Sequence, residues 1–144
     1  MDDFEKYEQE CQRIRKANKR LLKEFEAWLK SSGLKGKTIN NHVMNIDFYV
    51  NEFLLSEDAT EARDGAGLVD LFLGYWFIKK AMWASQTSMR GNAASLKKFY
   101  TFMCEKELIE KEDLDDLKAV IKEEMPEWLE TLARYDDPSV EDVW

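Results

Sequence analysis

Residues 38–55 read TINNHVMNIDFYVNEFLL, and this stretch decides the fold. Five of its apolar residues point within about 40° of one direction when successive residues turn by 100°, as in an α-helix. These residues are Ile39, Val43, Ile46, Val50 and Phe53. The spacing predicts a helix with one buried face. We expect Thr38 to be its N-cap, because a side-chain oxygen there accepts a backbone hydrogen bond.

Residues 85–109, SQTSMRGNAASLKKFYTFMCEKELI, predict a second helix of the same kind. Several hydroxyl side chains between Ser85 and Ser88 are suited to cap it. The predicted buried stripe consists of Met89, Ala93, Leu96, Tyr100 and Met103, flanked by Phe99. The opposite side carries the small and basic residues Arg90, Gly91, Ala94, Lys97, Lys98 and Thr101. Such a face allows close approach of either a phosphate backbone or another protein helix.

A long helix is predicted ahead of these two, over residues 3–31, with Gly33 as its stop. Apolar residues alternate spacings of three and four along it, as in the seam of a coiled coil, and Asn18 occupies a seam position. The N-terminal half therefore either pairs with a second copy, giving a homodimer, or folds back on its own domain. Its outer side carries a basic line, suited to phosphates or to solvent: Arg13, Lys16, Arg20 and Lys23.

Residues 68–83, LVDLFLGYWFIKKAMW, are apolar on all sides, which predicts a buried central helix. We expect its aromatic residues, Tyr75, Trp76, Phe77 and Trp83, to lie in the core rather than to stack on nucleic-acid bases. Residues 111–134 predict a fifth helix with acidic outer faces. We expect Pro126 to interrupt that helix and to begin a sixth, because proline is tolerated only at the start of a helical turn.

The composition indicates one all-α domain. Of 144 residues, 44% are hydrophobic, and only two prolines and six glycines oppose helix formation. We predict a compact orthogonal bundle of five to six helices over residues 1–134 and an acidic tail over 135–144. No apolar run approaches the ~20 residues needed to cross a bilayer, and the N-terminus lacks the apolar region of a signal peptide. With two isolated cysteines, Cys11 and Cys104, we expect a cytoplasmic protein that contacts no membrane.

The net charge of −8 is unevenly distributed along the chain. Residues 1–101 contain 16 Lys and Arg against 14 Asp and Glu, a net charge of +2. Residues 102–144 contain 5 Lys and Arg against 15 Asp and Glu, a net charge of −10. The body is therefore mildly basic, whereas the acidity belongs to the last helix and the tail.

The sequence contains no pattern of residues typical of catalysis or cofactor binding. The single histidine, His42, lies beside an apolar stripe, which favours a place at the edge of the core over a role as ligand or base. One histidine and two isolated cysteines form no zinc pattern, and no glycine-rich phosphate loop occurs. We therefore expect no enzyme, no catalytic residues, no metal, no cofactor and no small-molecule substrate.

Residues 25–109 resemble the N-terminal core-binding (SAM-like) domain of tyrosine recombinases, also called phage integrases. The likeness rests on three segments, FEAWLKSSGLKGKTINNHV from Phe25, YVNEFL from Tyr49 and SLKKFYTFM from Ser95. It implies a helical module that grips one face of duplex DNA. The catalytic set of the family includes two arginines, a lysine, histidines and a tyrosine. The 35 residues after Ile109 contain one arginine and no histidine, so we expect no strand cleavage by this chain.

The resemblance implies that two helices, beginning near residues 38 and 85, face the DNA. The implied DNA-binding residues are Lys35, Lys37, Asn40, Asn41, Asn45, Arg90, Lys97 and Lys98. Amides near a positive helix terminus are suited to base edges or to phosphates, and cations neutralise phosphates. The alternative is a helical protein-interaction or dimerisation module that has lost DNA binding and whose acidic surface meets a basic partner.

Overall fold

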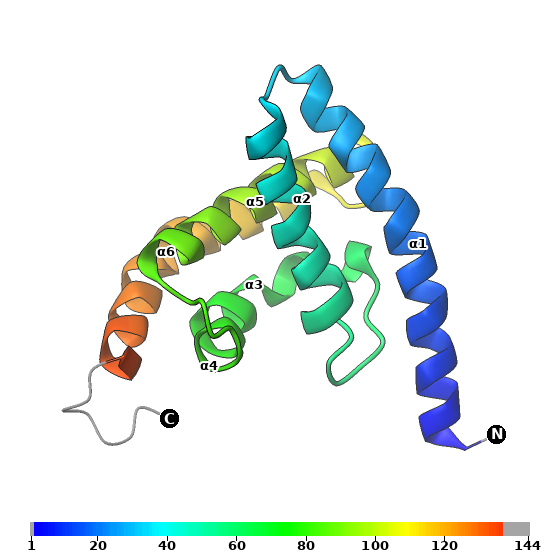
Figure 1. Cartoon of the computed structure of the whole chain (residues 1–144), viewed down its shortest axis with the longest axis horizontal. Helices are drawn as coiled ribbons and strands as arrows, with labels where there is room; N and C mark the ends of the chain where they lie inside the picture. Colours follow the sequence, from blue (N-terminus) through cyan, green and yellow to red (C-terminus); the bar gives the residue numbers. More distant parts are fainter. Residues whose placement is uncertain (1, 137–144) are drawn as a thin grey trace.

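The computed structural model describes residues 2–136, which fold into helices joined by short turns, with no strand in that range (Figure 1). The all-α prediction is confirmed. The first helix, α1 (Asp3–Ser31), begins and ends as predicted. The Asp2 carboxylate accepts a hydrogen bond from the Glu5 backbone N–H at 2.8 Å, and Gly33 turns the chain with a φ of 84°.

The second helix, α2 (Gly36–Phe48), starts two residues before Thr38, so the predicted N-cap is wrong. Lys35 occupies the cap position with extended backbone and no side-chain cap, and its carbonyl already accepts the Ile39 N–H at 3.0 Å. The hydroxyl of Thr38 is therefore not needed to start the helix. A π-helical turn, η1 (Tyr49–Phe53), continues α2 toward the end of the predicted stretch.

The predicted helix over residues 68–83 is a broken helical run that ends earlier than expected. After a short turn η2 (Ala62–Asp64), the run comprises η3 (Ala66–Leu68), α3 (Val69–Leu71), η4 (Phe72–Trp76) and α4 (Phe77–Lys80). Phe77 is fully buried as predicted, but Tyr75 and Trp83 are 41% and 56% exposed, which corrects their assignment to the core. Tyr75 lies on the side of the run away from the core, and Trp83 lies in the turn beyond α4, so neither is enclosed.

The fourth predicted helix is α5 (Gln86–Glu105), and its cap and its buried stripe are confirmed. Ser85 and Ser88 form a capping box, in which each side chain bonds the backbone N–H of the other residue. All six predicted stripe residues are at most 2% exposed: Met89, Ala93, Leu96, Phe99, Tyr100 and Met103.

The last helix, α6 (Lys111–Asp136), runs through Pro126 without a break, so the predicted division into two helices is wrong. Pro126 lies on the exposed side, while Trp128 and Leu132 beyond it are each 2% exposed. The Trp128 indole N–H also donates to the Asp70 carboxylate at 2.7 Å. Burial of these two side chains on the same core outweighs the hydrogen bond that proline removes.

Two buried tyrosines attach the connector between η1 and α3 to the core. The Tyr49 hydroxyl donates to the Gly65 carbonyl at 2.6 Å, and the Tyr100 hydroxyl donates to the Ala62 carbonyl at 2.8 Å. Both rings are fully buried. Burial raises the pKa of each phenol, so both remain neutral donors. The connector is therefore part of the core and not a loose loop.

The apolar seam of α1 is occupied within the chain. Cys11 and Ile14 pack on Leu55 at the end of the η1 region. Asn18, 2% exposed, donates to the Val50 carbonyl at 3.3 Å and to the Asn51 side-chain oxygen at 2.8 Å. This supports the second of the two expectations for α1, folding back on its own domain. A homodimer through the same seam remains a prediction.

The predicted domain boundary at residue 134 and the tail at 135–144 are only partly described. Residues 135 and 136 belong to α6, and residues 137–144 lie outside the described part of the chain. None of the described helices combines the length and the apolarity needed to cross a membrane.

Two glycines of the connector provide a stability test. A Cβ added at Gly65 would lie 2.6 Å from the Tyr100 hydroxyl oxygen and 2.7 Å from a Leu54 methyl carbon. Because both neighbours are buried, we expect Gly65→Ala to lower the free energy of unfolding by about 1–3 kcal/mol. Urea denaturation followed by circular dichroism measures this change.

The matched control is Gly67→Ala, where no atom lies within 4 Å of the added Cβ. We expect this variant to unfold within about 0.5 kcal/mol of the wild type, since an exposed site tolerates the methyl group. Equal unfolding midpoints for the two variants would contradict the close packing around Gly65.

Candidate nucleic-acid interface

The two helices predicted to face DNA are fixed to each other at one hydroxyl group. α2 passes across α5 (Figure 1). The buried Ser95 of α5 lies at their contact, where its hydroxyl bonds side chains of α2. Its Oγ lies 2.7 Å from Nδ1 of His42 and accepts the side-chain N–H of Asn45 at 3.0 Å. Ser95 Oγ also lies 3.0 Å from the Gly91 carbonyl of its own helix, to which it donates. The relative position of the two polar faces is therefore set by the crossing itself.

The predicted residues at the start of α2 are exposed. Lys35 is the residue before α2, and Lys37 lies in its first turn, which contains no acidic residue. Asn40 and Asn41 follow on the exposed side of the helix. Asn40 makes only a weak local contact, from its amide to the Met44 sulfur at 3.5 Å. Free backbone N–H groups at a helix N-terminus favour anions, and the two lysines add to this preference.

Asn45 and Lys98 are partly turned away from solvent. Asn45 uses its amide N–H on Ser95, so this part of the amide belongs to the helix crossing. Lys98 lies close enough to His42 for its charge to act on the imidazole. The sequence predicted that both residues contact DNA directly. In the structure, Asn45 also donates a hydrogen bond to Ser95 of α5.

On α5 the predicted cations lie on both sides of the crossing. Arg90 precedes Ser95 by five residues, and Lys97 follows it by two; both are exposed. No ion pair within the described residues involves Arg90 or Lys97, nor any of the three predicted lysines Lys35, Lys37 and Lys98. These charges are therefore available to an external anion.

The sequence predicted a basic line on α1, and the structure adds Arg15 and Lys19 to the basic surface of that helix. Residues 13–23, RIRKANKRLLK, contain six Lys and Arg and no acid. Arg15, Lys19 and Lys23 line a groove of about 390 Å³ between α1 and α2. The groove adjoins the outer side of α2.

The environment of His42 favours the neutral imidazole. Burial lowers the pKa of His42 below its usual value of 6.5, and the positive charge of Lys98 lowers it further. The ring sits half-buried at the edge of the core, as its sequence position indicated. Within residues 2–136, no group of three or more His, Cys, Asp or Glu side chains is placed to hold a metal ion.

Comparisons with known proteins found no protein-family model, no curated protein and no solved structure that matches the chain. The arrangement of amides and unpaired cations around the α2–α5 crossing is suited to bind a polyanion.

The pKa of His42 provides a direct test of the crossing. We expect the imidazole to titrate below 6.5 in the folded protein, and Lys98→Gln to raise that pKa because it removes a nearby positive charge. Since folding favours the neutral form, the contribution of His42 to stability is present above pH 6.5. It is lost as the pH falls, because the unfolded state takes up the proton more readily. NMR titration of the imidazole Cε1 proton measures the pKa.

The matched control is Lys97→Gln, which removes the same charge from the neighbouring residue on the exposed side of α5. We expect the pKa of His42 to change less in this variant than in Lys98→Gln. A wild-type pKa at or above 6.5 would show that the ring is not enclosed at the crossing.

Proposed function

We propose that this chain is a non-catalytic module that binds duplex DNA through α2 and α5. One observation carries the proposal: five cations around the crossing have no acidic partner within the described residues, although the chain is acidic overall. They are Lys35, Lys37, Arg90, Lys97 and Lys98. The resemblance of residues 25–109 to recombinase core-binding domains points to the same surface.

The chemistry of the surface favours a phosphate backbone over an isolated anion. Lys35 and Lys37 lie at one end of α2, while Arg90 and Lys97 are seven residues apart on α5, about 10 Å along its axis. Charges spread in this way match the repeated phosphates of a duplex, where each contact releases condensed counterions. The exposed amides of Asn40 and Asn41 are able to bond either phosphates or base edges.

The acidic part of the molecule does not oppose this mode of binding. The carboxylates of the last helix lie on α6, which packs on α5 and on the α3–η4 run. The outward face of α2 is not covered by α6 in the described chain. A duplex on α2 and on the exposed side of α5 thus meets the basic side of the domain.

Removal of single cations should reduce DNA affinity at any sequence. We expect Arg90→Ala and Lys97→Ala each to lower the slope of log affinity against log salt by about 1, because each loses one phosphate contact. Fluorescence anisotropy of a labelled random 25-mer duplex, titrated between about 50 and 200 mM salt, measures the slope.

The control is Lys118→Ala, which removes an exposed cation from α6, away from the proposed surface. It should leave the slope unchanged. If Arg90→Ala and Lys97→Ala bind as the wild type does, the α2–α5 surface is not the DNA face. If the wild type fails to bind at about 50 mM salt, the proposed function itself is wrong.

A second candidate is an interaction module whose acidic surface meets a basic protein, and a specific observation favours it. Residues 112–130 of α6 carry eight carboxylates that are exposed or, for Glu124, partly exposed: Glu112, Asp113, Asp115, Asp116, Glu123, Glu124, Glu127 and Glu130. Among these, the described part of the chain pairs only Asp115, with Lys111 at 3.7 Å. Failure of DNA binding in the titration above, with a folded protein, would favour this second candidate.

A further inference from the structure

A groove of about 610 Å³ lies on the side of α1 that faces the connector and the end of α5. Its walls come from three places in the chain: α1 from Ile14 to Glu24, the turn η2, and the α5–α6 junction near Leu108. The α1 wall is about 15 Å long, close to three helical turns. The DNA-binding surface proposed above, on α2 and α5, does not use this groove.

The floor of the groove is apolar. Ile14 and Met103 lie at its base with 2% and 1% of their surface exposed, and the partly buried Leu21 and Leu108 extend it. Ala17 is an exposed residue on the α1 wall, and its small side chain leaves room for a second backbone to approach. A phosphate backbone gains little from such a floor, whereas an apolar stripe on a peptide is buried by it.

The rim of the groove is positively charged on both walls. Arg20 and Lys23 lie on α1 and Arg63 lies opposite them on η2, and these three have no ion pair within residues 2–136. The two acids on the rim are already paired. Glu24 accepts from Lys106 at 2.6 Å, and Glu61 lies 3.7 Å from the guanidinium of Arg13.

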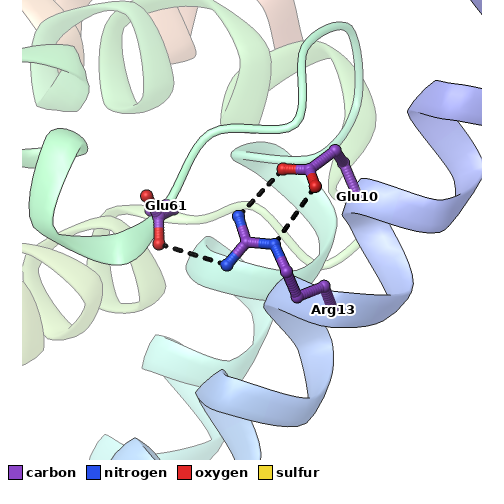
Figure 2. A network of polar contacts seen from close by, with 3 residues as sticks. All are labelled: Glu10, Arg13 and Glu61. Atoms are coloured by element: carbon purple, nitrogen blue, oxygen red, sulfur yellow. Dashed lines mark hydrogen bonds and ion pairs between the residues drawn. The ribbon is translucent and has the colours of Figure 1, made fainter.

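Figure 2 shows how Arg13 connects α1 to the connector at one end of the groove. Its guanidinium bonds both Glu10 oxygens, at 3.2 and 2.8 Å, and reaches across to Glu61. The same contact holds the pKa of the Glu10 carboxyl below its usual value. Arg13 is shared between Glu10 and Glu61, so this network keeps a single negative charge. The three cations Arg20, Lys23 and Arg63 outnumber it, and the rim stays positive.

We propose that this groove binds an acidic amphipathic helix of a partner protein. An apolar stripe with spacings of three and four residues fills the floor, as in other helix-in-groove complexes. Asp or Glu residues on both flanks of the stripe meet the cations of the two walls. Charge complementarity selects this occupant, since a basic or neutral helix would leave three desolvated cations without partners.

Peptide selection without DNA tests the proposal independently of the proposed function. A displayed library of random helical peptides of about 14 residues, four turns, is panned on the wild-type chain. The variant Ala17→Trp, which fills the groove from an exposed position, serves for counter-selection. We expect the enriched peptides to combine an apolar stripe with acidic flanks. No enrichment over the counter-selection, or enriched peptides that lack acidic residues, would overturn the proposal.

Affinities of one selected, fluorescein-labelled peptide then locate the contact. We expect Ala17→Trp to weaken peptide binding at least about tenfold, because the indole fills the groove. We expect the double variant Arg20→Glu, Arg63→Glu to weaken it to the same degree, because it reverses the charge of the rim. Lys19→Glu reverses one exposed charge on the side of α1 that faces α2, away from this groove, and should alter affinity less than about threefold. Circular dichroism and the unfolding midpoint verify that each variant is folded. Equal affinity of wild type and both groove variants would place the peptide elsewhere.

Discussion

The crossing of α2 and α5 at Ser95 is the constraint on which the rest of the structure depends. A side chain with no exposed surface must satisfy its hydroxyl, and here it does so with His42, Asn45 and its own helix. Serine is also small enough to let the two helices approach closely. A larger residue would separate them and open the core, and an alanine would leave two polar groups of α2 without their partner.

From that crossing the two sides of each helix acquire separate roles. The inward side of α5 contributes Tyr100, and the η1 turn that continues α2 contributes Tyr49. The hydroxyls of these two residues hold the connector. The outward sides leave Lys37 and Lys97 in solvent. The polar surface is rigid for the same reason that the core is closed, because both are carried by the same pair of helices. When a polyanion binds cations on such a support, the side chains of the cations lose conformational freedom, but the backbone loses little.

Much of the fold was predictable because helical periodicity is a strong signal when one face is buried, as it is in α5. The predictions failed where tertiary contacts override a local rule. Pro126 is a local helix breaker, yet α6 continues because Trp128 and Leu132 share one core surface. The site was less predictable. Arg90 and Lys97 follow from the face opposite the stripe, whereas the bond from Asn45 to Ser95 depends on how two helices cross, which one chain segment does not encode.

The separation of acidic α6 from the basic residues of α1 and α2 gives the molecule an asymmetric charge distribution that its net charge of −8 does not convey. The electric field of a polyanion exerts a torque on such a molecule before the two touch. The molecule turns its basic end forward at a distance of about one Debye length, ~10 Å at 0.1 M salt. Encounters are then oriented, not random, and productive collisions become more frequent without any added attraction at the surface itself.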